Sequence, residues 1–210
     1  MNAWMAHTAF SSTTSRGRGR PREFDLDAAL DKSVRVFRER GYHATSIADL
    51  TEAMKLASGS VYKAFKDKRA VFLAAFDREA IVRWEKLRRL LSTAKSGRDR
   101  VRVALTLIAE SSHGVEGKRG CLIVGTAAEL ATFDPEVAQR VKAALDKNER
   151  LIVDLIRQGQ ADGSIPATID RKVTARLILC LLQGMRVIGK TGRKRTEMRA
   201  VANAAMKLLS

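Results

Sequence analysis

Apolar side chains recur every three or four residues along almost all of this 210-residue chain, and this spacing constrains the fold more than any other feature. The first run consists of Leu26, Leu30, Val34 and Phe37. Gly41 follows at the position where a helix often ends with a left-handed residue. Because the chain has only three prolines, long helices are free to form later on. The pattern predicts an all-α protein of about nine helices.

Two short helices are expected after this first one. Thr45 and Ser46 offer N-caps for the earlier of them, and Asp49, three residues after Ser46, completes the pattern of a capping box. Ser58 is the expected N-cap of the later one. Three such helices in succession predict an N-terminal helix-turn-helix module.

The last of these helices has a polar outward face. Val61 and Phe65 are four residues apart and face inward, which leaves hydroxyls, an aromatic ring and a cation outside: Ser58, Ser60, Tyr62 and Lys63. Small side chains let a helix approach the bases closely in a major groove of DNA. We therefore expect this face to contact DNA.

The N-terminal residues 1–21 are expected to form a flexible basic arm, because residues 11–21 are rich in Ser, Thr, Gly and Arg and cannot bury surface. Arg18, Arg20 and Arg22 suit phosphates or a minor groove, although a generic basic tail has the same composition. The whole chain has 39 Lys and Arg against 23 Asp and Glu, a formal net charge of +16. This charge favours a polyanionic partner but does not place the contact surface.

The sequence GYHATSIADL, which starts at Gly41, precedes SGSVYKAFKDK, which starts at Ser58. Together they resemble the signature of the tetracycline-repressor (TetR/AcrR-like) family, and the match covers residues 22–76. The resemblance implies a helix-turn-helix DNA-binding domain over residues 22–68 and a helical dimerisation and ligand-binding bundle over residues 69–210. It also implies a sequence-specific transcription regulator, a ligand-released dimeric repressor of a pseudo-palindromic operator. The alternative is a basic architectural protein that binds double-stranded DNA without reading its sequence.

The resemblance also implies which residues contact DNA. Those expected to hold phosphate are Thr45, Tyr62 and Lys68, although a plain cap and a packed tyrosine are the structural alternatives for the first two. Those expected to face the bases are Ser58, Gly59, Ser60 and Lys63. Lys55 stands where the family often has Gly in a turn. If that turn is left-handed, a non-Gly residue costs on the order of 1 kcal/mol, and the lysine adds a phosphate contact.

The second half of the chain reads as helices over residues 67–91, 98–112, 121–132 and 134–159, with a loop over residues 114–120. The helix that begins after Asp170 is apolar on more than one face, so it buries two sides. A twofold partner or an internal core would cover the second side. The resemblance implies a homodimer, with an interface formed by Leu177, Leu181, Gly184, Met185 and Ile188.

An unidentified small-molecule effector is also implied. By the family's architecture its pocket lies among the central helices, and the candidates to line it are Trp84, Leu105, Ile108, His113, Cys121, Glu129 and Phe133. Each has an ordinary alternative as a core side chain or a solvated charge.

Several classes of protein are not expected. His113 with Cys121 or a neighbouring serine suggests a nucleophile and base, but no orienting acid accompanies them, so we expect no enzyme. Cys121 and Cys180 are far apart and no Cys/His cluster occurs, so we expect no metal, cofactor or disulfide framework. The sequence also lacks a signal peptide and an apolar run of ~18 residues. We expect a cytoplasmic protein at the bacterial nucleoid, without a membrane partner.

Overall fold

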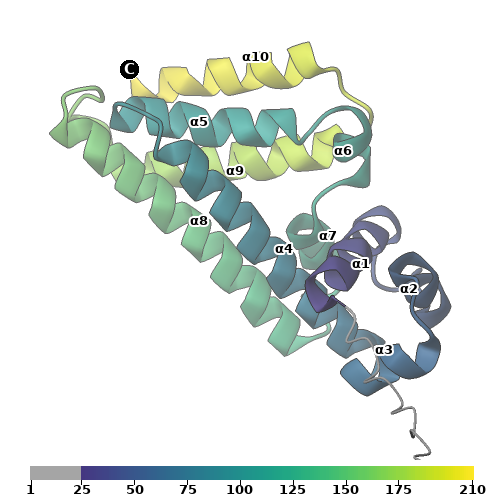
Figure 1. Ribbon diagram of the computed structural model, residues 1–210. Coiled ribbons are helices and arrows are strands. Elements are labelled where there is room, and N and C mark those ends of the chain that lie inside the picture. Colours follow the sequence, from purple (N-terminus) through teal and green to yellow (C-terminus); the bar gives the residue numbers. More distant parts are fainter. Residues whose placement is uncertain (1–24) are drawn as a thin grey trace, which may run out of the picture.

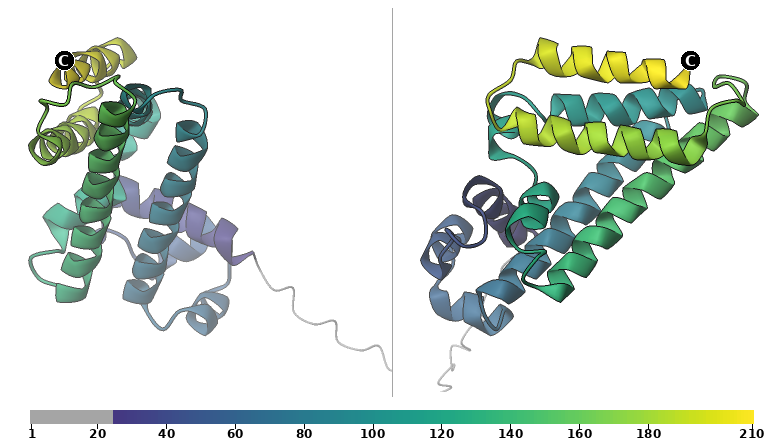
Figure 2. Two further views of the ribbon diagram at one scale, coloured as in Figure 1. Left: turned by 90° about the vertical axis from the view of Figure 1, so that its left-hand side faces the viewer. Right: turned by 180° about the vertical axis from the view of Figure 1, so that it is seen from behind.

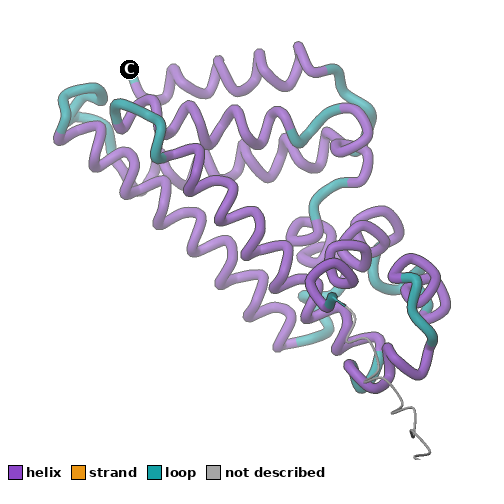
Figure 3. The backbone as a smooth tube through the Cα atoms, in the orientation of Figure 1, coloured by secondary structure: helices purple, strands orange, loops and turns teal. Residues whose placement is uncertain are grey.

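The computed structural model describes residues 25–210, and over that range the chain consists of helices and their connections (Figures 1 and 3). The expected all-α fold is confirmed, with ten α-helices and a terminal 3₁₀-helix in the described part. They are α1 (Leu26–Arg40), α2 (Ile47–Met54), α3 (Ser58–Ala64), α4 (Lys68–Leu91), α5 (Gly97–Glu110), α6 (Gly114–Arg119), α7 (Leu122–Glu129), α8 (Pro135–Ala161), α9 (Arg171–Gly189), α10 (Arg195–Ala205) and η1 (Met206–Leu209). None of these helices is long and apolar enough to cross a membrane. The candidate DNA contacts Arg18, Arg20 and Arg22 lie outside the described residues.

Side-chain caps fix where several helices begin. Asp134 accepts the N–H of Val137 at 3.1 Å ahead of α8, and Pro135 occupies the first helical position. Asp170 caps α9 in the same way. The predicted cap at Ser58 is wrong: Ala57 precedes α3 with an extended backbone, and Ser58 is already the first helical residue.

Helix α6 replaces the predicted loop over residues 114–120. Its glycines lower helix propensity, which is why the sequence pattern predicts a loop. One of them is required by packing, because a Cβ on Gly117 would lie 2.6 Å from the carbonyl carbon of Ser112. Close contact with neighbouring backbone therefore stabilises a helix that local propensity does not.

Two hydrophobic clusters form the core. One cluster contains residues of α1, α2, α3, α4 and α7 and of the start of α8. In it the rings of Phe37 and Phe72 meet edge to face, with their centroids 5.1 Å apart. The other joins α5, α8, α9 and α10. The long helices α4 and α8 run diagonally between the two ends of the molecule (Figures 1 and 2). The helical spacing of apolar residues in α4 predicts that Ile81 faces inward, but the structure leaves it 53% exposed.

Candidate nucleic-acid interface

Helix α3 lies at the end of the molecule opposite α10 (Figures 1 and 2). Within this helix Val61 is buried, whereas Tyr62 is 55% exposed. Ser58, Gly59 and Lys63 are also exposed, and Ser60 is half-buried. No atom lies within 4 Å of a Cβ built on Gly59. The outward orientation of this face is confirmed, and its contact with DNA stays a prediction.

Helix α2 supports α3 through a well-defined start. Ser46 and Asp49 form the predicted capping box, in which the Ser46 N–H donates to Asp49 Oδ2 at 2.8 Å and the Asp49 N–H donates to Ser46 Oγ at 3.1 Å. Hydrogen bonds from Ser46, then one from Arg40, lower the pKa of Asp49 to about 2. The carboxylate is therefore ionised under all ordinary conditions.

The turn between α2 and α3 contains a strained lysine. Lys55 has φ 59° and ψ 44°, and it is the one non-glycine residue of positive φ between residues 25 and 210. Its N–H donates to the Glu52 carbonyl oxygen at 3.1 Å, which closes the turn. The left-handed conformation considered from the sequence is confirmed, with its cost on the order of 1 kcal/mol. The side chain is exposed beside α3.

Thr45 is directed into the protein, which contradicts the expected phosphate contact of its side chain, whereas Lys68 is half-buried and its phosphate contact stays a prediction. Thr45 is 1% exposed, and its hydroxyl donates to the Gly41 carbonyl oxygen at 2.6 Å. Lys68 Nζ donates to the carbonyl oxygens of Tyr42 and Thr45 at 3.0 and 2.9 Å. It also lies 4.2 Å from the centroid of the Tyr42 ring. Both side chains therefore hold the α1–α2 loop.

The same loop is tied to α7 by Glu129. The Glu129 carboxylate accepts the N–H groups of Tyr42 and His43 at 2.9 and 2.7 Å. Gly41 has φ +81°, a conformation that favours glycine, and a Cβ at this position would lie 2.7 Å from Glu129 Oε2. The expected place of Glu129 in an effector pocket is therefore wrong. No sequence signal connects residues 42 and 129.

A cavity of about 450 Å³ is lined by residues of α1 and of the helices from α4 to α9. Of the seven candidates, Trp84 and Ile108 line it and the others do not. The other side chains are placed as follows: Leu105 in the core, His113 at the start of α6, Cys121 beneath Arg186, Glu129 at the α1–α2 loop, and Phe133 82% exposed. Helical spacing does not reveal which of several apolar faces borders an empty volume.

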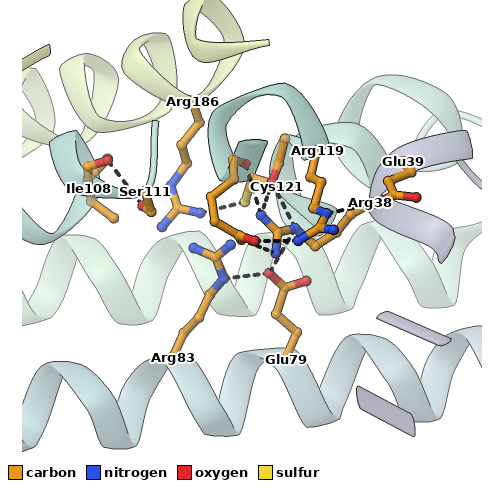
Figure 4. Close-up of polar contacts among 11 residues, drawn as sticks. Arg38, Glu39, Glu79, Arg83, Ile108, Ser111, Arg119, Cys121 and Arg186 are labelled. Carbon is orange, nitrogen blue, oxygen red and sulfur yellow. Dashed lines mark hydrogen bonds and ion pairs between the residues drawn. The ribbon is translucent and has the colours of Figure 1, made fainter. Parts of the chain in front are cut away.

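Charged side chains that the sequence analysis missed gather at one wall of this cavity (Figure 4). Arg83 Nε donates to Glu79 Oε1 at 2.5 Å, and Arg38 Nε lies 3.9 Å from the same oxygen. Arg38 also forms an ion pair with Glu116 at 3.0 Å. Arg186 enters from α9 and points toward Arg83 (Figure 4). In the sequence these residues are indistinguishable from the charges of a solvated helix face.

The predicted interface residues of α9 lie on two faces. Leu177 is 48% exposed, Ile188 is exposed and Gly184 has open space at its Cβ position, whereas Leu181 packs partly against the core. Met185 is 2% exposed and lies in the core, so its expected place in a dimer interface is wrong. Its position on the helix follows Ile178 and Leu182, which face inward.

Comparison with known proteins decides the family. The model of the family described as "Bacterial regulatory proteins, tetR family" matches residues 29–75, and "Tetracyclin repressor-like, C-terminal domain" matches residues 97–205. The chain belongs to the tetR family. This TetR-family chain is 30% identical over 203 residues to the HTH-type transcriptional repressor ComR of Escherichia coli (strain K12), with 96% of each chain covered.

Solved structures of TetR-family regulators share the fold. A cysteine mutant of the regulator CifR, complexed with 26-base-pair operator DNA, is 34% identical with a TM-score of 0.78, covering 90% of this chain and 98% of that one. A TetR regulator from Chloroflexus aurantiacus J-10-FL is 26% identical with a TM-score of 0.77, covering 85% and 90%. The resemblance seen in the sequence is confirmed, and this TetR-family chain is a DNA-binding transcription regulator.

Proposed function

We propose that this TetR-family regulator is a homodimeric repressor that binds a pseudo-palindromic operator and is released by a small-molecule effector. The exposed face of α3 supports this proposal most directly. Lys63 is free to donate to guanine O6 and N7, and the Tyr62 hydroxyl to a phosphate. Ser58, Gly59 and Ser60 let the helix approach the bases closely. Lys55 adds a phosphate contact, and Arg18, Arg20 and Arg22 add others by sequence alone.

A homodimer follows from the size of this surface. One helix of seven residues touches too few base pairs to be selective, whereas two related by a twofold axis read two half-sites. The exposed apolar residues Val173, Leu177 and Ile188 lie along α9, with Gly184 between the last two. We propose that α9 packs against its twofold copy along this stripe.

The effector acts on the spacing of the two α3 helices. Arg38 of α1 reaches the cavity wall, and α4 carries Glu79 and Arg83 at the cavity. Glu129 ties the α1–α2 loop to α7. A ligand in the cavity therefore changes contacts that position the DNA-binding helices.

The proposal also covers the domain border, the absence of a catalytic role and the location of the protein. We propose that the border between the DNA-binding and effector-binding parts lies after residue 68. The hydrophobic cluster of α1–α4 and α7 contains residues from both sides of this border and so couples the two parts. The relatives described above are transcription regulators, and we propose no catalytic role for this chain. Because its partner is chromosomal DNA, we place it at the nucleoid in the bacterial cytoplasm.

The test is a fluorescence-anisotropy titration on operator variants that differ in one half-site base. Lys63→Ala is expected to change which half-site is preferred by roughly 10- to 100-fold, because a base contact is lost. Tyr62→Phe is expected to weaken binding to all variants alike. Lys207→Ala, the same charge change on the distant η1, serves as the control. Uniform losses from both α3 variants would favour the architectural alternative.

A further inference from the structure

The cavity contains a cation without a carboxylate partner. The Nε of Arg186 is shielded from solvent and makes no hydrogen bond to the described residues. Its Nη1 contacts the Sγ of Cys121 at 2.6 Å, and no ion pair joins the guanidinium to a carboxylate of residues 25–210. A buried charge in this position costs free energy unless an anion compensates it.

A second guanidinium increases that cost. Arg83 points toward Arg186 from the opposite helix (Figure 4). Burial lowers the pKa of Arg186, and repulsion from Arg83 lowers it further. Glu79 attracts both guanidinium groups, but its Oε1 already accepts from Arg83 and lies 3.9 Å from Arg38. The geometry leaves room for one more negative charge.

The rest of the cavity lining also has more cationic than acidic side chains. The whole lining within the described chain includes six Lys and Arg side chains but three Asp and Glu side chains. Lys147 is one of these cations, and its Nζ lies 4.0 Å from the centroid of the Trp84 ring. Leu107, Leu151 and Leu182 give the cavity an apolar wall. The volume of about 450 Å³ is typical of a small-molecule site.

We propose that this cavity binds an amphipathic organic acid, with the carboxylate between Arg186 and Arg83 and the apolar body against the leucine-lined wall. Its role as effector rests on the proposed function, whereas binding itself does not. A ligand carboxylate at Arg83 competes with Glu79, whose Oε2 already lacks a partner within the described residues. The charge of Glu79 is then compensated only by Arg38, so ligand binding alters an ion pair of α1.

Calorimetric titration of the purified chain without DNA tests the binding. The probes are octanoate, 1-octanol and octylammonium, followed by longer and aromatic carboxylates. We expect octanoate to bind at least about tenfold more tightly than octanol, because a hydrogen-bonded charge pair is added in a buried site. Octylammonium is expected not to bind, because the site is cationic.

Arg186→Met removes the charge and keeps a similar side-chain length. We expect it to abolish the preference for octanoate over octanol, and to raise the Tm of the empty protein because an uncompensated charge is gone. A merely structural role would lower the Tm instead. Arg157→Gln, an exposed arginine on α8, is the control and leaves both quantities unchanged.

Each of these results would overturn the inference: equal affinity for acids and alcohol, no binding of any acid, or an unchanged preference in Arg186→Met. Competition by inorganic phosphate at equal affinity would also overturn it, because an amphipathic ligand would not be needed. Operator binding is measured separately on the same preparation. A protein that binds its operator but no acid retains the proposed function and refutes only this inference.

Discussion

Lys68 has a role in the structure that the sequence does not show. Its ammonium group donates to two carbonyl oxygens of the α1–α2 loop and covers the Tyr42 ring. We expect Lys68→Met to lower the free energy of unfolding by about 1–3 kcal/mol, because these carbonyls lose a charged donor. Urea denaturation measures this, and Lys63→Met on the exposed face of α3 is the matched control. Unchanged stability together with a shallower salt dependence of DNA binding would favour the predicted phosphate contact over this role.

Asp49 makes the start of α2 sensitive to acid. Its pKa is lowered from 3.8 to about 2 in the folded chain, chiefly by hydrogen bonds from Ser46. A group with a lowered folded pKa stabilises the protein above its unfolded pKa, and this contribution is lost as the pH falls from about 4 toward 2. We expect the Tm of Asp49→Asn to depend less on pH than that of the wild type across this interval. Parallel pH profiles for the two proteins would contradict the assigned capping box.

Side-chain orientation is predictable where a residue's own helix decides it. Tyr62 and Lys63 face outward because Val61 faces inward, and the spacing already shows this. Thr45 and Lys68 are not predictable in this way. Their partners are backbone carbonyls of a folded loop, which the sequence does not distinguish from any others. The polar candidates whose side chains bind folded backbone are therefore the ones whose contacts within the protein the sequence does not reveal.

At the scale of elements, α7 is tied to the α1–α2 loop through one carboxylate, that of Glu129. We expect Glu129→Gln to weaken operator binding by about 1–2 kcal/mol, because the charge that accepts the Tyr42 and His43 N–H groups is lost. Anisotropy titration measures the change, with Glu85→Gln on the exposed side of α4 as the control. Full affinity in Glu129→Gln would show that this contact does not position α2 and α3.

Helix α9 carries the proposed dimer contact. Leu177→Glu places a charge on its exposed stripe, and we expect a folded monomer, because Leu177 contributes little to the protomer's own core. Sedimentation velocity gives the oligomeric state and circular dichroism the helix content. Val115→Glu on α6 alters another exposed apolar residue and should leave the dimer intact. A dimeric Leu177→Glu would place the interface elsewhere.

Elements differ in how far the sequence predicts them. The starts of α8 and α9 are predictable because Asp134 and Asp170 cap them locally. Helix α6 is not, because Gly117 is required by the backbone of Ser112 rather than by helix propensity. The cavity is not predictable either, because it is the volume that seven packed helices leave unfilled.

On the scale of the whole molecule, two hydrophobic clusters are joined by α4 and α8, so the cavity and the DNA-binding end belong to one connected structure. The net charge of +16 adds attraction to any DNA. Binding strength alone therefore does not establish a regulator. Only discrimination between sequences does, and in the proposed function this discrimination depends on the two α3 faces of the dimer.

The most direct test of a sequence-specific regulator is a titration at fixed salt on the protein's own upstream intergenic DNA and on a scrambled duplex of equal length. A site-specific TetR-family dimer is expected to prefer the upstream DNA by ~10³ or more, since specific binding typically exceeds non-specific binding by at least that factor. Equal affinity for both duplexes, with a steep salt dependence on each, would contradict the account and indicate a basic protein that coats DNA without reading it.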